Sequence, residues 1–147
     1  MISLLEFESA MPPDDRLTTV EDAIHVIRGQ RVMLDSDLAV IYGVQLKRLN
    51  EQVRRNAKRF PPDFAFQLTR EEFTNLKSQF ATSSLHGGKR KLPWVFTEHG
   101  AIMLASVLNT SVAIDASIRV VRAFVRLREM ISANAELARN FAELEHR

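Results

Sequence analysis

One short segment constrains the fold of this chain more than any other: DSDLAVIYGVQLKRLNEQVRRNAKRF, residues 35–60. Its opening Asp-Ser-Asp is typical of a helix start, and Gly43 is typical of a helix end because glycine adopts left-handed backbone angles without strain. A second helix is predicted to begin near Gln45. It cannot continue past Pro61-Pro62, since proline lacks the amide hydrogen that a helix needs. The segment therefore predicts a helix, a glycine turn and a second helix, the arrangement of a helix-turn-helix.

The second helix of this segment is predicted to have an apolar face and a basic face. Leu46, Leu49 and Val53 recur at helical spacing and form the expected core stripe. Residues 45–60 carry six basic side chains and one acidic one, and at about 100° per residue most of these lie opposite the stripe. The side chains predicted opposite the stripe are Lys47, Arg48, Glu51, Arg54, Arg55 and Lys58.

A basic helix of this kind is suited to the major groove of duplex DNA. A helix with its side chains is about 10–12 Å across, which fits that groove, and arginine pairs there with guanine or with phosphate. Asparagine and glutamine pair with adenine, which adds the amides of the same segment to the candidates. A solvated basic face on a small domain is the alternative interpretation. The candidate amides are Gln45, Asn50, Gln52 and Asn56.

Charge is segregated along the chain, although the formal net charge is only +2. Residues 1–25 carry six acidic side chains and one basic one, and residues 129–147 carry four acidic and two basic ones. Residues 26–128 carry 17 basic and 8 acidic side chains, a balance expected of a protein that binds a polyanion. The loop at 81–91 is predicted either to follow a phosphate backbone or to be merely solvated, and it ends in Lys89, Arg90 and Lys91.

A hairpin is predicted before this segment, in the stretch HVIRGQRVML. Two apolar-rich runs flank Gly29-Gln30, and glycine at the first turn position suits a type II′ turn. In that register Arg28 and Arg31 face each other, so a nearby anion would relieve their repulsion. Two solvated arginines at a hairpin tip are the alternative.

After Pro61-Pro62, a short strand and a helix are predicted. Phe64, Phe66 and Leu68 alternate with Ala65, Gln67 and Thr69, which predicts a half-buried strand. The sequence TREE at 69–72 is a capping box, and it opens a helix whose expected core residues are Phe73, Leu76 and Phe80.

The C-terminal half is predicted to hold a further strand and two helices. The strand covers 92–96, Thr97 caps a nearly all-apolar and therefore buried helix, and residues 109–111 separate that helix from a long one. Together these elements predict an α+β fold: a small domain that contains the helix-turn-helix, short strands and a hairpin, and a long C-terminal helix. The expected organisation is a loose acidic leader at 1–18, the domain at 19–130 and a helical tail at 131–147.

The last helix carries two further patterns. Its apolar residues alternate at spacings of four and three, which predicts either a coiled-coil seam in a homodimer or packing against its own domain. Its arginines form either a solvated face or a second set of phosphate contacts. The apolar residues are Val120, Phe124, Leu127 and Ile131, with Leu137, Phe141 and Leu144 resuming the rhythm, and the arginines are Arg119, Arg122, Arg126 and Arg128.

Several classes of function find little support in the sequence. The chain has no cysteine, its four histidines are scattered, and it lacks a glycine-rich phosphate loop, so no enzyme, cofactor or metal is expected. Asp35 and Asp37 are interpreted as helix-start residues, not as ligands of a nuclease metal. The longest apolar run, Ala101–Ala105, is too short to cross a bilayer, and the acidic N-terminus is not a secretory signal. A cytoplasmic, nucleoid-associated protein is expected.

Three blocks in this order resemble the KilA-N type DNA-binding domain, in the branch found at the N-terminus of phage and prophage regulatory proteins. They are MLDSDLAVIYGVQLKRLNEQVRRNAKRFPPDFAFQLTREEF, LPWVFTEHGAIMLASVLN and VRAFVRLREM, and the resemblance covers Ile24 to Met130. It implies a compact α+β domain that binds DNA. The LNxQVxRNxxRFP pattern falls on Leu49 to Pro61 and implies Arg54, Arg55, Asn56, Lys58 and Arg59 as DNA-facing residues. The TExG pattern falls on 97–100 and is interpreted as a helix start.

The expected function is binding of double-stranded DNA by a phage- or prophage-derived transcriptional regulator. Many relatives carry a second, variable domain after this one, whereas only a short helical tail follows here, so an effector module is not expected within this sequence. The alternative is an antirepressor, a module whose C-terminal helix binds a repressor protein. That alternative depends on the tail, whereas DNA binding depends on the basic helix.

Overall fold

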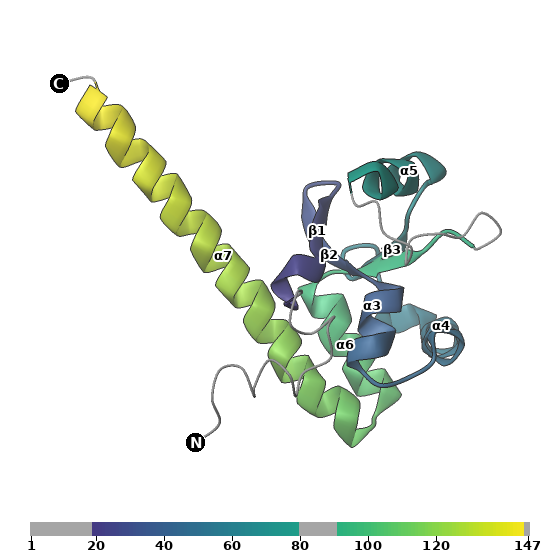
Figure 1. The fold of residues 1–147 in the computed structure, drawn as a ribbon. Helices are drawn as coiled ribbons and strands as arrows, with labels where there is room; N and C mark the ends of the chain where they lie inside the picture. Colours follow the sequence, from purple (N-terminus) through teal and green to yellow (C-terminus); the bar gives the residue numbers. More distant parts are fainter. Residues whose placement is uncertain (1–18, 80–90, 146–147) are drawn as a thin grey trace, which may run out of the picture.

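The structure, a computed structural model, describes residues 19–79 and 91–145. It confirms the α+β class: these ranges form a small antiparallel sheet, several helices and one long C-terminal helix (Figure 1). In chain order the elements are η1 (Glu21–Ala23), β1 (Ile24–Ile27), β2 (Gln30–Leu34), α3 (Asp35–Ile41), α4 (Leu46–Arg55), η2 (Ala57–Arg59), β3 (Ala65–Gln67), α5 (Arg70–Gln79), β4 (Trp94–Phe96), α6 (Glu98–Leu108) and α7 (Ser111–Glu145). The predicted leader, Phe80, Lys89 and Arg90 lie outside the described residues.

The sheet has the order β1-β2-β4-β3 and separates two apolar cores. On one face Met33 pairs with Phe96, and both belong to the larger core, which α3, α4, α6 and α7 cover. On the other face Leu34 pairs with Val95, and α5 covers this smaller core with Phe73 and Leu76. Burying both faces of short strands stabilises a sheet of this size, because each strand contributes apolar area on either side.

Strand β3 differs from the predicted half-buried strand. Phe66 and Leu68 are buried in the smaller core as expected, but Ala65 is buried as well, in the larger core on the opposite face. Only Gln67 of this strand is exposed. The alternation predicts an apolar and a polar face, whereas Ala65 pairs with Phe96 and both are buried in the larger core.

The predicted hairpin forms, but its turn lies one residue earlier than expected. Ile27 pairs with Gln30, so Arg28 and Gly29 are the central turn residues, with φ of 56° and 73°. Positive φ at both positions is typical of a type I′ turn, not of the predicted type II′. Arg31 consequently faces Val26 and not Arg28.

An anion does lie beside Arg28, and it comes from the capping box. The Arg28 guanidinium donates to both carboxylate oxygens of Glu72, at 2.8 and 2.9 Å, and its Cζ lies 4.2 Å from the centroid of the Phe66 ring. Glu72 also accepts from the Thr69 amide at 2.8 Å, while the Glu72 amide donates to the Thr69 hydroxyl at 3.1 Å. The capping box is therefore confirmed, and it also anchors the hairpin to α5.

Glycine ends α3 as predicted. Gly43 has a φ of 68°, its amide donates to the Val40 carbonyl and the Val44 amide donates to the Ala39 carbonyl, which together make a Schellman motif. The helix start differs in detail, because Leu34 occupies the N-cap position. Asp35 is instead buried in the first turn.

The TExG block at 97–100 has the structural role expected of a helix start. The Thr97 side chain accepts from the Gly100 amide at 3.3 Å, which caps α6. Gly100 is required there, because a Cβ at that position would lie 1.9 Å from the Phe64 carbonyl oxygen. Glu98 accepts from Arg128, and His99 stacks on Phe64 with ring centroids 5.7 Å apart.

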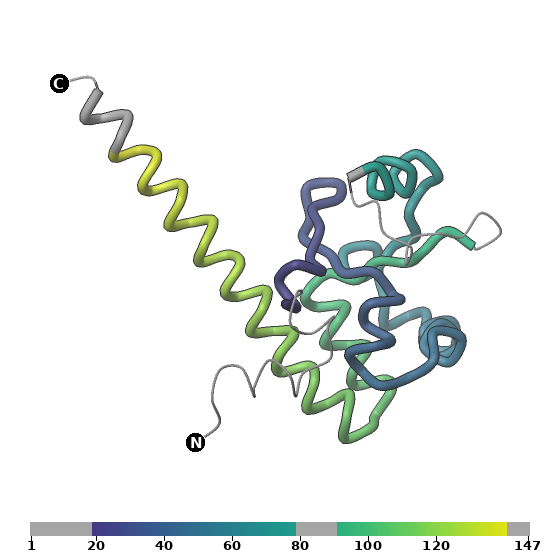
Figure 2. Tube along the Cα trace, viewed as in Figure 1, coloured from purple at the N-terminus to yellow at the C-terminus, as the bar shows by residue number. Residues whose placement is uncertain are grey.

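Helix α7 leaves the domain halfway along its length (Figure 2). Its first half packs against α6 and η1 and buries Ala113, Val120 and Phe124, so packing against its own domain is the correct interpretation for this part. The side chains of residues 128–140 are all exposed. Within the described ranges, no helix is both long and apolar enough to cross a membrane.

Candidate nucleic-acid interface

Helix α4 is held by the apolar stripe that its spacing predicts. Leu49 is fully buried, Val53 is 8% exposed, and Leu46 is partly buried against the same core. The helix packs against both α3 and α6. Tyr42 at the end of α3 fixes this arrangement further, since its buried hydroxyl donates to the Ala101 carbonyl on α6 at 2.8 Å, and burial raises the pKa of that phenol.

The cations of this segment point away from the core. All six are exposed: Lys47, Arg48, Arg54, Arg55, Lys58 and Arg59. Arg54 and Arg55 occupy the last turn of α4, where the helix dipole favours positive charge. The structure thus gives these residues the exposure that DNA contact requires, while the contact itself stays a prediction.

The end of α4 differs from the prediction, and Asn56 lies where it ends. The helix ends at Arg55, and the Gln52 carbonyl accepts from both the Asn56 backbone amide at 3.1 Å and the Asn56 side chain at 2.9 Å. Asn56 is therefore partly buried and engaged in a cap. Lys58 and Arg59 lie on the separate turn η2, so the predicted position of Lys58 on a continued helix face is wrong.

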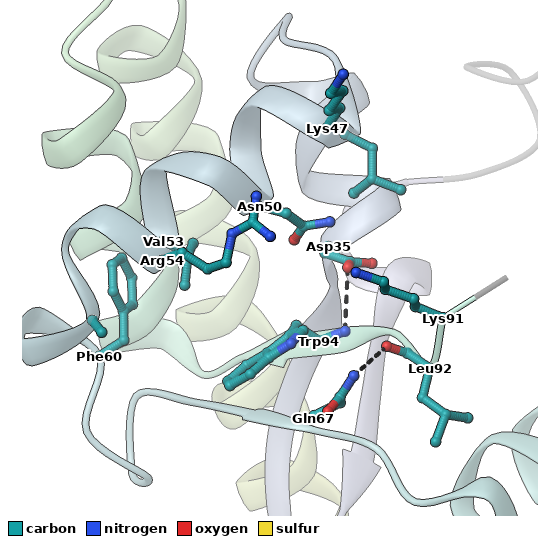
Figure 3. Close-up of a pocket in the computed structure, with 12 residues that line it drawn as sticks. Asp35, Lys47, Asn50, Val53, Arg54, Phe60, Gln67, Lys91, Leu92 and Trp94 are labelled. Carbon is teal, nitrogen blue, oxygen red and sulfur yellow. Dashed lines mark hydrogen bonds between the residues drawn. The ribbon is translucent and has the colours of Figure 1, made fainter.

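A cleft of about 720 Å³ lies between α4 and the sheet (Figure 3). One wall comes from α4 and η2, and the other comes from the ends of β3 and β4. The apolar lining includes Leu46, Val53, Phe60, Leu92 and Trp94. The polar lining consists of Asp35, Lys47, Asn50, Arg54, Gln67 and Lys91.

The cleft brings together candidate residues that are far apart in the sequence. Lys47, Asn50 and Arg54 from α4 share it with Lys91, which precedes β4. Arg48 and Arg55 are not among its lining residues, so the cations of α4 divide into a cleft side and an outer side.

Sequence reasoning missed Trp94 and Gln67. Trp94 is the only tryptophan of the chain, but a tryptophan in a short apolar strand is ordinarily a core residue, so no local signal marked it. Its position in the cleft depends on α4, which is distant in the sequence.

Asp35 joins the helix-turn-helix to the sheet. Its carboxylate accepts from the Ser36 amide at 2.7 Å and from the Trp94 amide at 3.2 Å. The side chain is 2% exposed, so these hydrogen bonds offset the cost of burying a carboxylate. Asp35 therefore ties the start of α3 to β4.

Three arginines outside α4 are held in ion pairs. Arg28 pairs with Glu72, Arg126 donates to Glu21 at 2.6 Å, and Arg128 donates to Glu98 at 2.5 Å. The side chains of Arg126 and Arg128 stay about half exposed beside these carboxylates, so a solvated face and a second set of phosphate contacts both remain open for them. Arg119 and Arg122 are exposed on α7.

No described group of three or more histidine, aspartate or glutamate side chains is arranged to hold a metal ion. The cleft presents cationic, amide and aromatic side chains.

Comparison with known protein families matches residues 22–107 to the ORF6N domain. The matched stretch covers more than half of the chain and contains the helix-turn-helix, the four strands and nearly all of α6. Comparisons with curated proteins and with solved structures find no match.

Proposed function

This chain belongs to the ORF6N domain family, a phage-associated family, and from that premise we propose that it binds duplex DNA through α4. In this proposal α4 lies in the major groove, where its cations pair with phosphates and with the edges of guanine. The contacts on the helix are Lys47, Arg48, Arg54 and Arg55, and Lys58 and Arg59 on η2 reach the flanking backbone.

The observation that carries the proposal is the concentration of exposed cations on α4 and η2. Arg28, Arg126 and Arg128 are matched by carboxylates of the same chain. The six cations of α4 and η2 take part in none of the ion pairs seen among the described residues, although they crowd into one short segment. Like charges held so close repel one another, and a row of phosphates relieves that repulsion.

The finer proposal is a KilA-N type domain in a phage or prophage transcriptional regulator. The LNxQVxRNxxRFP pattern supports it, because its apolar and basic positions have separate roles here. Leu49, Val53 and Phe60 are buried, and Phe60 meets Phe96 edge to face at 5.9 Å. Asn56 caps the helix, which leaves the basic positions of the pattern exposed for DNA.

Binding of a short dye-labelled duplex, followed by fluorescence anisotropy across a salt series, tests the proposal. The test variant is Arg54→Ala/Arg55→Ala. We expect the wild type to bind tightly at low salt and the variant to bind more weakly, with a slope of log K against log[salt] that is smaller by about 0.9 for each lost phosphate contact.

The matched control is Arg119→Ala/Arg122→Ala, which removes the same charge from exposed positions of α7. This control is expected to keep the affinity and the salt slope of the wild type. An equal loss in both variants would show that net charge, and not α4, determines binding. No binding by the wild type at low salt would rule out the proposed function.

A second candidate function is protein binding by the C-terminal helix, as in an antirepressor. The observation that favours it is the exposed half of α7, where Met130, Ile131 and Leu137 are 57%, 43% and 54% exposed. Exposed apolar residues on one helix suit a partner helix. In that case a repressor protein binds α7, and the Arg54→Ala/Arg55→Ala variant still binds that repressor.

A further inference from the structure

We propose that the cleft between α4 and the sheet binds the base of an unpaired nucleotide in the bound DNA. The base packs against Trp94, and its phosphate lies at the mouth, near Lys47, Arg54 and Lys91. This inference rests on the proposed function, since it names a second element of the DNA that the same surface recognises.

The size and lining of the cleft suit a flat, partly apolar ligand. Its volume of about 720 Å³ lies within the range of small-molecule sites, roughly 300–1,000 Å³. Apolar atoms form most of the exposed wall, although six of the twelve lining residues are polar or charged. A site with an apolar interior and a small number of placed polar groups binds a ligand in one orientation.

Trp94 provides an aromatic platform whose position is fixed before any ligand arrives. The residue lies in β4, paired with Gln67 of β3, and its amide donates to the buried Asp35. Its side chain is half-buried against the larger core and lines the cleft (Figure 3). Stacking on an aromatic side chain accepts any base, because every base presents a π-face.

The polar groups favour a nucleotide over an uncharged aromatic compound. Three cations line the cleft, and its one carboxylate, Asp35, already accepts two backbone amides. A phosphate at the mouth would gain from these cations, whereas a base in the interior would meet the Asn50 amide, which both donates and accepts hydrogen bonds. Gln67 is held in place by donating to the Leu92 carbonyl at 3.0 Å.

The position of the cleft favours a nucleotide that belongs to DNA. Lys47, Asn50 and Arg54 line the cleft from the same helix that presents Arg48 and Arg55 on its outer side. A stacked base cannot reach the cleft, so the nucleotide must be extrahelical, at a bulge or a distorted step. The cleft would thereby give tighter binding to DNA that exposes an extrahelical nucleotide than to a fully paired, regular duplex.

Two labelled duplexes test this inference, one fully paired and one with a single bulged nucleotide. Anisotropy gives the affinities, and the fluorescence of Trp94, the only tryptophan, reports on the cleft. We expect the bulged duplex to bind at least about fivefold more tightly and to quench Trp94 more strongly than the paired one.

Two substitutions at Trp94 and one at Lys91 separate a loss of base stacking from a loss of folding. Trp94→Leu is expected to abolish the preference for the bulge, and Trp94→Phe is expected to retain most of it, because phenylalanine still stacks. Lys91→Glu is a second variant at an exposed position, chosen because it leaves the core untouched. It is expected to lower the preference while circular dichroism stays that of the wild type.

The outcomes distinguish this inference from the proposed function. Equal affinity for both duplexes, with unchanged Trp94 fluorescence, overturns the cleft proposal and leaves duplex binding in place. Failure to bind either duplex overturns the proposed function as well. Quenching by a free deoxynucleoside monophosphate, with no difference between the duplexes, assigns the cleft to a small ligand and overturns its assignment to DNA.

Discussion

Gly100 shows how a single residue joins two parts of this domain. It lies in the first turn of α6, directly against the chain that leads into β3, and the carbonyl of Phe64 occupies the space where a side chain would lie. The same Phe64 carbonyl accepts from the Thr97 amide at 2.9 Å, so the two segments are held close by a hydrogen bond as well. The requirement for glycine is therefore steric and not a matter of backbone angles.

Gly100→Ala is expected to destabilise the protein by about 2 kcal/mol or more, because the added methyl group forces α6 away from Phe64. Urea denaturation measures the change. The control is Ser106→Ala, at an exposed position of the same helix, with an expected change within about 0.5 kcal/mol. Equal stability of the two variants would contradict the role assigned to Gly100.

At the scale of elements, the hairpin and α5 are joined by one ion pair. Arg28 sits in the turn between β1 and β2, and Glu72 sits in the first turn of α5. The hydrogen bonds from Arg28 lower the pKa of the Glu72 carboxyl to about 2 from an ordinary value of 4.5. The charged carboxylate therefore favours the folded state.

This shift predicts an acid-dependent loss of stability. The contribution of Glu72 is fully present above about pH 4.5, where the unfolded chain is also ionised, and it is lost as the pH falls toward 2. Glu72→Gln keeps an oxygen that accepts from the Thr69 amide but removes the charge. Thermal melts between pH 7 and pH 2.5 should show the stability difference between wild type and variant shrinking with acidification. A difference that is constant with pH would count against the Arg28–Glu72 interaction.

The elements that sequence reasoning predicted well are those that local chemistry determines. The stripe of Leu49 and Val53, the glycine stop at Gly43 and the capping box at 69–72 depend on spacings within a few residues. The hairpin register was not predictable, because the positive φ of Arg28 is accompanied by contacts with Glu72, 44 residues away. The half-buried interpretation of β3 failed for the same reason, since helices on both faces decide its burial.

The candidate site was predictable only in part. The exposure of the α4 cations follows from helical periodicity, but the cleft depends on how α4 lies over β4. Nothing near Trp94 or Lys91 in the sequence indicates that both line the same cleft as Arg54. The early end of α4 was also missed, because Asn56 leaves the helical backbone angles, with φ of −118° and ψ of 34°, well before the two prolines that mark a stop in the sequence.

At the scale of the whole molecule, α7 divides into a packed half and an exposed half. The packed half belongs to the core of the domain, through Val120 and Phe124. The exposed half carries apolar side chains that have no role in that core. The spacing of four and three in the sequence predicts that a second copy of the chain covers them, in a homodimer that would compete with the repressor partner described above.

Sedimentation velocity across a range of concentrations tests the dimer. The wild type is expected to associate, whereas Ile131→Glu/Leu137→Glu is expected to stay monomeric, because two buried charges at a helix seam oppose association. The domain itself should melt unchanged, since both positions are exposed. Ser132→Glu adds negative charge at an exposed position about 100° around the helix from Ile131 and should still associate. A monomeric wild type at all concentrations would refute the homodimer.

Because α7 is one uninterrupted helix from Ser111 to Glu145, the direction of its far end is coupled to the orientation of the domain. Each residue inserted after Leu127 would rotate the apolar side chains beyond it by about 100° around the helix axis and move them outward by about 1.5 Å. An insertion of seven residues restores the original direction to within about 20°. The number of residues in the helix therefore determines the angle between the direction in which its far apolar side chains face and the direction in which α4 faces.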